Sequence, residues 1–198
     1  MKSLVLLVVA LLSINVYPQK FDIDAAKAIF LKDGSKIIPK QNDVRNDPED
    51  NCITYWNEGS SWAKYIKYKD LDYVTIGNKL FKTFEFKQKG KTKKEKPIGM
   101  FVLIETNEYR LLAIDYVGGA GYFTIIDNDD LIIESKGCAW GKSKKDIEKQ
   151  NEIVGVIKKY FSNLEEEMGF LEYCKSKDDG YSNGLIQYLK EHSYKKYN

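Results

Sequence analysis

The chain has 198 residues, of which 43% are hydrophobic and 13% aromatic, and its formal net charge is only +2. This composition is typical of a folded globular protein and excludes disorder of the whole chain. Arg45 and Arg110 are its only arginines. Because the planar guanidinium group is the preferred reader of phosphates and base edges, we do not expect a nucleic-acid-binding protein.

The first 19 residues predict a secretory signal peptide. Lys2 precedes an apolar run at 4–12, and a more polar stretch at 13–19 follows it. The run is too short for a permanent membrane anchor, and it lacks the amphipathic period of the alternative, a core helix or strand. We therefore expect an exported protein, in the periplasm, the cell envelope or outside the cell. It would be cleaved near Gln19 and have no transmembrane span in its mature form.

The part from residue 29 to residue 135 is rich in strand signals. Two β-prone runs flank Asp33 and Gly34, a dipeptide that favours a hairpin with a type I′ turn. Residues 39–51 are mostly polar, with Val44 as the only sizeable apolar side chain, and predict a solvated loop. Further strands are expected at 52–56, 62–68, 71–76 and 79–86.

The segment 97–135 is the densest apolar run of the mature chain and predicts the centre of a sheet. Interruptions at 106–108, 117–121 and 127–130 divide it into four pieces of strand-like length. This spacing is typical of neighbouring strands that pair antiparallel. Residues 137–141 are then expected to form a connection.

Helices are expected only towards the C-terminus. Ser143 and Asp146 form an N-cap signal ahead of an apolar period that runs over 147–171. Ser162 begins a second match to a capping box, so the pattern fits either one long helix or two helices with a break near this residue. A last short helix is predicted at 183–192.

Strands first and helices last predict an α+β fold, in which an antiparallel meander sheet is followed by amphipathic helices. After the signal peptide, residues 20–198 are expected to form a single domain, β-rich over 29–135 and helical over 143–192. The alternative is a closed or half-closed β-barrel with a helical tail, for which about nine strands would suffice.

The residue types of common catalytic and metal sites are scarce. His192 is the only histidine and lies near the C-terminus, which disfavours a catalytic triad and a histidine-based zinc site. Cys52, Cys138 and Cys174 are far apart, and they form either one disulfide with a thiol left over or three buried small side chains. The sequence therefore predicts no catalytic residue of these kinds, no metal and no cofactor.

Two charged segments each allow two interpretations. Residues 127–130 supply oxygens suited to Ca²⁺, but they lack the spacing of an EF-hand loop, and a surface turn uses the same residue types. The lysine-rich segment 87–96 would attach the protein to an anionic surface, or it serves solubility at a hairpin tip.

The candidate binding site is a turn between two tryptophans. Trp56 and Trp62 flank a polar stretch that contains Asn57 and Glu58. Aromatic rings beside amides and carboxylates are the kind of surface that stacks on a sugar or grips a peptide. The other interpretation is that both tryptophans close the end of the core.

A carboxylate-dependent hydrolase would need two carboxylates that face each other. Asp115 is the strongest candidate for one of them, because it lies in the apolar run 111–116 and burial would raise its pKa. A paired structural carboxylate is the other interpretation of this residue.

The chain resembles a loose group of uncharacterised exported proteins of the Bacteroidota. The resemblance rests on the short signal peptide that ends at Gln19, on the segment 68–74 (YKDLDYV) ahead of a hairpin, and on C-terminal amphipathic helices that end in the segment 194–198 (YKKYN). It implies export and no particular chemistry, so no functional residue is carried over from it.

The leading hypothesis is therefore a secreted or envelope-associated, non-enzymatic binding protein of unknown ligand or envelope partner. A carboxylate-dependent hydrolase is one alternative. The other is a structural or accessory subunit that docks on a partner through the apolar face of its C-terminal helices.

Overall fold

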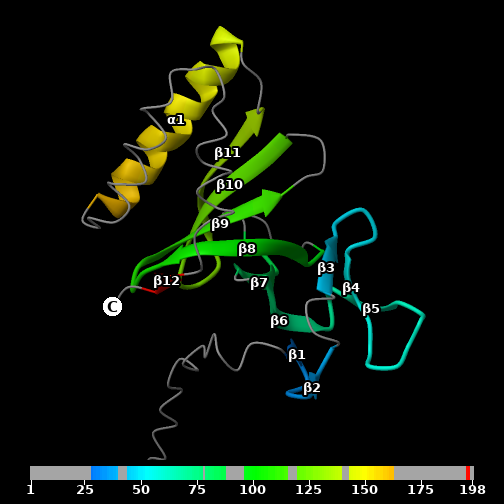
Figure 1. The fold of residues 1–198 in the computed structure, drawn as a ribbon. Helices are drawn as coiled ribbons and strands as arrows, with labels where there is room; N and C mark the ends of the chain where they lie inside the picture. Colours follow the sequence, from blue (N-terminus) through cyan, green and yellow to red (C-terminus); the bar gives the residue numbers. More distant parts are fainter. Residues whose placement is uncertain are drawn as a thin grey trace, which may run out of the picture.

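The computed structural model describes residues 28–39, 44–77, 79–87, 96–115, 120–139, 143–162 and 195–196. These residues form a large, mainly antiparallel sheet, a small three-stranded sheet and one helix, so the predicted α+β class is confirmed (Figure 1). The predicted signal peptide, His192 and the last predicted helix lie outside the described residues.

The large sheet has the strand order β11-β10-β9-β8-β7-β6-β1-β2, and the short strand β12 pairs in parallel with the end of β8. Within the described residues, β11 and β2 are the two ends of this order, so the sheet is not closed and the barrel alternative is wrong. The strands are β1 (Ile29–Leu31), β2 (Lys36–Ile37), β6 (Leu71–Ile76), β7 (Lys79–Phe84), β8 (Ile98–Glu105), β9 (Tyr109–Asp115), β10 (Ala120–Asp127), β11 (Ile132–Ala139) and β12 (Lys195–Lys196).

The predicted four-stranded meander is confirmed as β8 to β11, which are neighbours both along the chain and in the sheet. Its last strand is longer than expected, because β11 runs on to Ala139. The expected connection at 137–141 is therefore wrong over its first three residues. The physical reason is pairing: β10 already begins at Ala120, which lies opposite Ala139, so the backbone of 137–139 has a partner.

The hairpin at Asp33 and Gly34 is confirmed, but its turn is not of type I′. Gly34 has a φ of +84°, whereas Asp33 does not have a positive φ. The N–H of Gly34 donates to the carbonyl of Leu31 at 3.0 Å, and the N–H of Leu31 donates to the carbonyl of Ser35 at 2.9 Å. The turn is thus a three-residue loop that ends in a left-handed glycine, which is the next most common hairpin connection.

The small sheet consists of β3 (Val44–Asp47), β4 (Cys52–Tyr55) and β5 (Lys64–Lys67), in that order and antiparallel. β3 lies within the segment that was expected to be a solvated loop, so that expectation is wrong for these four residues. Pairing with β4 satisfies the backbone of β3, and Val44 packs against the core. An edge strand needs few other apolar side chains.

The helix α1 (Lys144–Phe161) begins with the predicted cap. The Ser143 hydroxyl accepts a hydrogen bond from the N–H of Asp146, and the Asp146 carboxylate accepts one from the N–H of Ser143. The helix ends at Phe161, with Ser162 as its C-cap, the position of the break in the two-helix alternative. The choice between one helix and two is not tested, because residues 163–194 lie outside the described part.

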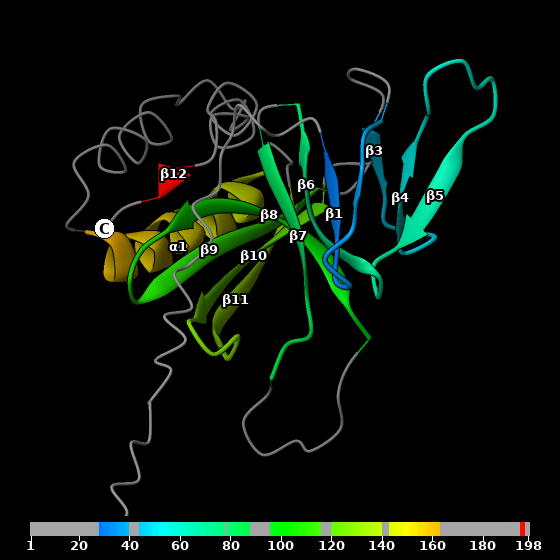
Figure 2. The same cartoon turned by 90° about the horizontal axis from the view of Figure 1, so that it is seen from below.

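Three apolar clusters hold these elements together. The first lies between α1 and one face of β8, β9 and β10, and the second lies on the opposite face of these strands and includes residues of β7. The third joins the small sheet to β1, β6 and β7. Figure 2 shows the result: α1 lies along one side of the large sheet, and β3, β4 and β5 project from its other end. We call this small sheet, with its loop at 56–63, the β3–β5 arm.

Close packing fixes the base of the arm. The buried ring of Tyr68, just after β5, lies with its centre 5.8 Å from that of Phe81, and its hydroxyl donates to Asn46 Oδ1 at 2.6 Å. A Cβ atom on Gly99 would lie 2.7 Å from Cζ of Tyr68 and would also meet the Phe81 ring. The backbone of β8 therefore approaches these rings more closely than any side chain would permit. Tightly packed side chains therefore connect the arm to the large sheet.

Candidate binding surface

The loop between β4 and β5 holds one tryptophan out in solvent. Gly59 has a φ of +74°, and the N–H of Ser60 donates to the carbonyl of Asn57 at 3.1 Å, which closes the predicted turn. The Ser60 hydroxyl then donates to the carbonyl of Trp62 and accepts from its N–H. The Trp62 side chain is 82% exposed. Its backbone is thus held in place while its ring contacts water.

The two tryptophans of the predicted site lie in different surroundings. Trp56 is half-buried, and the guanidinium carbon of Arg45 lies 5.1 Å from its ring centre. Glu58 is exposed at the tip of the turn. The Asn57 Oδ1 atom is buried and has no hydrogen-bond partner among the described residues. Trp62, and not Trp56, is therefore the aromatic side chain that this loop offers to a ligand.

The exposed surface continues along β5. Tyr65 is 68% exposed, and the ammonium group of Lys67 lies 5.4 Å from its ring centre. Lys67 also donates to the carbonyl of Asp50 at 2.8 Å, so the ammonium group has a fixed place. Lys64 and Lys69 are exposed. We call these five residues, Trp62, Lys64, Tyr65, Lys67 and Lys69, the β5 surface.

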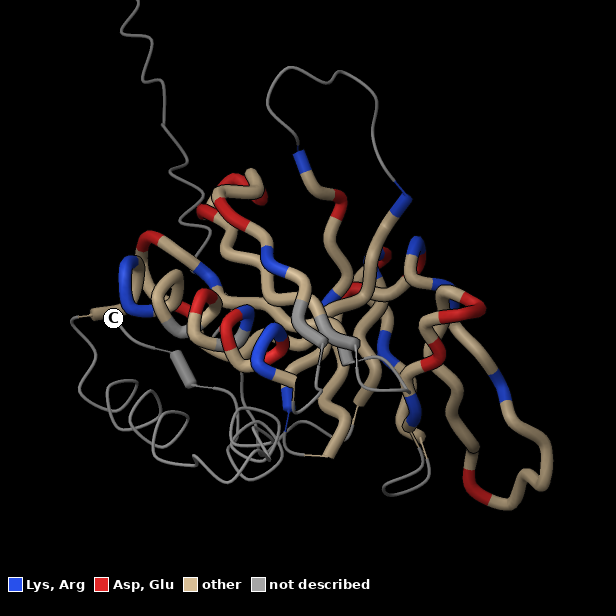
Figure 3. Tube along the Cα trace, turned by 90° about the horizontal axis from the view of Figure 1, so that it is seen from above, with Lys and Arg blue, Asp and Glu red and all other residues tan. Residues whose placement is uncertain are grey.

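The β5 surface is locally basic on a protein of mixed charge. The segment 61–69 contains three lysines and no carboxylate. Elsewhere, Figure 3 shows both signs of charge interspersed along the described chain. Sequence reasoning found Trp62 but missed Tyr65 and the lysines beside it. The signal was available, since residues 62–68 alternate and Tyr65 falls opposite Ile66 in that alternation.

A cleft of about 640 Å³ lies beside β5, between this strand and the turn of the β1–β2 hairpin. Lysines and aspartates line it together with Tyr65. Two hydrogen bonds from Ser35 hold the Asp33 carboxylate and keep the pKa of this carboxyl below its usual value. The Nζ atom of Lys32 lies 3.7 Å from Oε1 of Glu85, so these two side chains form an ion pair. The lining residues are Leu31, Lys32, Asp33, Tyr65, Ile66, Lys67, Lys69 and Asp70.

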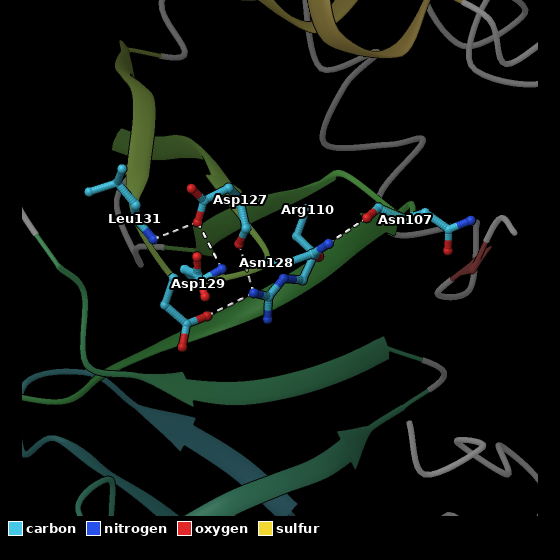
Figure 4. A network of polar contacts seen from close by, with 7 residues as sticks. Asn107, Arg110, Asp127, Asn128, Asp129 and Leu131 are labelled. Carbon is cyan, nitrogen blue, oxygen red and sulfur yellow. Dashed lines mark hydrogen bonds and ion pairs between the residues drawn. The ribbon is translucent and has the colours of Figure 1, made fainter. Parts of the chain in front are cut away.

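The acidic turn at 127–130 uses its oxygens within the fold (Figure 4). Asp127 Oδ1 accepts from the N–H groups of Asp129 and Leu131, both at 2.9 Å. Arg110 Nη2 donates to Asp130 Oδ1 and to the carbonyl of Asp127, both at 2.8 Å. These contacts support the surface-turn interpretation over the Ca²⁺ one. Among the described residues, no three histidine, cysteine, aspartate or glutamate side chains are placed so that they could hold a metal ion together.

The remaining sequence candidates are only partly covered by the structure. Asp115 is the last residue of β9 and lies opposite Gly121, but its side chain is outside the described part. Cys52 is buried and forms no disulfide, and burial raises the pKa of its thiol. The side chains of Cys138 and Cys174 are outside the described part, as is most of the lysine-rich segment 87–96.

Comparison with known proteins adds no relative: no family model, curated protein or solved structure matches this chain. Within the described residues, no helix combines the length and the apolar character that crossing a membrane requires.

Proposed function

We propose that this chain is an exported, non-enzymatic binding protein that contacts an anionic ligand through the β5 surface. One observation carries the proposal: two highly exposed aromatic rings and three lysines, with no carboxylate between them in sequence, lie on β5 and on the residues just before and after it, and the base of this arm is tightly packed. Aromatic faces supply contact area, and lysine ammonium groups supply attraction for negative charge. Export rests on the signal-peptide pattern of residues 1–19.

Exposing two large aromatic side chains lowers the stability of the protein, which is a disadvantage unless they have another role. Large aromatic side chains are normally buried, and exposing them forgoes the free energy that burial contributes. The Ser60 hydroxyl nevertheless holds the backbone of Trp62, whose ring is exposed. Rigid aromatic side chains at a surface are the usual anchors of binding sites, since they lose little conformational entropy on contact.

The accessory-subunit alternative lacks comparable support in the described residues. It requires an exposed apolar stripe on the C-terminal helices, but Ile153, Ile157 and Phe161 of α1 are buried against the protein's own sheet. The hydrolase alternative depends on Asp115, whose side chain is not described, and on a second carboxylate that faces it. We therefore place the ligand on the β5 surface.

The test is a binding titration of the mature chain with anionic polymers. Alginate, poly-glutamate and phosphatidylglycerol vesicles are each compared with a neutral counterpart, with isothermal titration calorimetry as the readout, because it does not depend on Trp62. We expect at least one anionic polymer to bind, and Trp62→Ala and Tyr65→Ala to weaken it about tenfold, as for aromatic anchors at other interfaces.

Tyr122→Ala is the matched control, because Tyr122 is also an exposed aromatic residue, 48% exposed, but lies on β10. It should leave the affinity unchanged. No binding to any anionic polymer, or equal losses for Tyr65→Ala and Tyr122→Ala, would contradict the proposal.

A further inference from the structure

We propose that the ligand of the β5 surface is an acidic, extended polypeptide segment that adds as a further strand to the outer edge of β5. This inference rests on the proposed function and names the class of its ligand. Three features carry it: an edge whose outward backbone groups have no partner in the described part of the chain, a cleft alongside that edge, and a charge pattern that selects the partner.

The outer edge of β5 is open in the described part of the chain, and the pairing with β4 defines which residues point their backbone groups outward. β5 pairs with β4 on one side, and no described residue pairs with it on the other. The N–H of Tyr68 donates to the carbonyl of Asn51 at 2.9 Å, so Tyr68 points its backbone towards β4. Because direction alternates along a strand, Ile66 and Lys64 also point towards β4, while Tyr65 and Lys67 point their backbone groups outward.

The outward backbone groups of β5 could form a few hydrogen bonds with a partner strand. The carbonyl of Lys67 is already used, because it accepts from the N–H of Asp70 at 3.0 Å. The N–H and carbonyl of Tyr65 and the N–H of Lys67 have no partner among the described residues and are left for an added strand. This addition of an extended peptide to a sheet edge is a common mode of peptide recognition, in which the backbone contributes the affinity.

The cleft gives such a peptide a place to lie. It is lined by Tyr65, Ile66 and Lys67 on the β5 side and by residues of the β1–β2 turn on the other. Its volume of about 640 Å³ is in the size range of ligand-binding clefts, and it is open to solvent rather than enclosed. A strand that pairs with β5 would therefore have protein beside it as well as along its edge.

Charge selects the partner. A second copy of β5 would bring its own Lys64 and Lys67 against the same lysines, and like charges across a strand pair are destabilising. Lysines on an edge strand are a known means of preventing self-association. An acidic strand meets the opposite situation along β5, since the ammonium groups of Lys64, Lys67 and Lys69 would lie near its carboxylates. The cleft itself is lined by three lysines and two aspartates, Asp33 and Asp70, so the charge of its lining is still net positive. The same lysines thus reject a second copy and favour an acidic peptide.

An acidic polysaccharide is the other occupant that the charges would permit. Its rings would stack on Trp62 and Tyr65, but it has no regular row of amide groups to match Tyr65 and Lys67. The open backbone edge therefore favours a polypeptide, and the polysaccharide becomes an outcome of the test.

The experiment measures binding of three fluorescent eight-residue peptides with capped ends to the mature full chain by fluorescence polarisation. The first peptide alternates glutamate and valine, and the second alternates lysine and valine. The third is the glutamate peptide with N-methyl groups on two consecutive central residues, which block both of its hydrogen-bonding edges. We expect the glutamate peptide to bind and to weaken as salt is raised. The other two should bind about tenfold more weakly or not at all.

A pair of variants tests the edge from the side of the protein. Tyr65→Ala removes the ring and keeps the N–H, whereas Tyr65→Pro also removes an N–H that points away from β4, a position where proline is tolerated in an edge strand. We expect Tyr65→Pro to bind the glutamate peptide about tenfold more weakly than Tyr65→Ala. Circular dichroism and thermal unfolding check that both variants fold. If Tyr65→Pro does not fold, the N-methylated peptide still tests backbone pairing on the wild-type chain.

Equal binding of the plain and N-methylated glutamate peptides would overturn the inference. If alginate or vesicles bind in a Trp62-dependent manner while the glutamate peptide does not, the inference fails and the proposed function stands. If no anionic probe binds, both fail.

Discussion

The two ends of the protein treat their apolar side chains in opposite ways. In the helix-covered half, formed by β8–β11 and α1, the helix residues Ile153, Ile157 and Phe161 are each 1% exposed. In the β3–β5 arm, Trp62 and Tyr65 are 82% and 68% exposed. The arm is not short of a core, because Ile53 and Ile66 are buried at its base. Burial therefore explains the fold of the helix-covered half, while the aromatic rings of the arm are surplus to folding and available for contact.

The largest effect is expected in the helix-covered half. Phe161→Ala empties a fully buried position between α1 and the sheet and should lower the free energy of unfolding by about 3–5 kcal/mol. Denaturant unfolding measures this loss. Ile147→Ala is the control on the same helix: its side chain is 39% exposed, so it should cost much less. Equal losses would mean that α1 does not pack on the sheet as described.

The second effect concerns the turn between β10 and β11. Arg110 has 14% of its side chain exposed and donates to both Asp127 and Asp130. Arg110→Met removes the donor to Asp130 Oδ1 and one of the two donors to the carbonyl of Asp127, which also accepts from the N–H of Asp130. It should cost about 1.5–3 kcal/mol, as for other hydrogen bonds to charged groups. Asp130→Asn should cost less, because asparagine also tolerates the φ of +61° found there. A negligible loss for Arg110→Met in denaturant unfolding would contradict this role.

The third effect tests the joint between the two regions. Gly99→Ala forces a Cβ against the rings of Tyr68 and Phe81 and should cost about 1–3 kcal/mol in thermal or denaturant unfolding. Adding Phe81→Leu should restore part of the loss. Gly155→Ala is the matched control, because nothing lies within 4 Å of a Cβ at this helical position, so it should stabilise by about 0.5–1 kcal/mol. If both glycine variants behave alike, the joint is not tightly packed.

The smallest effect on stability is expected in the arm. Trp62→Ala should change the free energy of unfolding by less than about 0.5 kcal/mol, because the side chain is exposed and packs on little. The same variant should lose binding in the polymer titration. A large loss of stability would mean that Trp62 supports the fold, and the comparison between the two regions would then break down.

Much of the fold could be predicted from periodicity and turn chemistry. The spacing of polar breaks located β8 to β11, and Ser143 with Asp146 marked the start of α1. Local sequence signals were less informative where pairing with a neighbouring strand decides whether a segment is a strand. β3 forms because β4 lies beside it, and β11 continues to Ala139 because β10 does, and neither fact is visible in the strand's own residues.

The candidate site was predictable only in part. The pair of tryptophans indicated the right loop, but in the strand expected at 62–68 the side chains would alternate and place Trp62 on the same face as the buried Ile66 and Tyr68. The structure differs because β5 begins only at Lys64, so Trp62 belongs to the loop and escapes the alternation. The open edge of β5 depends on which strands lie beside it, and this information is absent from any single stretch of sequence.

Amide hydrogen exchange followed by NMR on the wild-type chain tests the central claim most directly. In the free protein, the amides of Tyr65 and Lys67 should exchange much faster than those of Lys64 and Ile66, which point towards β4. Saturation with the glutamate–valine peptide should slow the exchange of Tyr65 and Lys67. Protection of these two amides in the free protein, or no change in their exchange on saturation, would contradict an open edge that accepts an acidic strand.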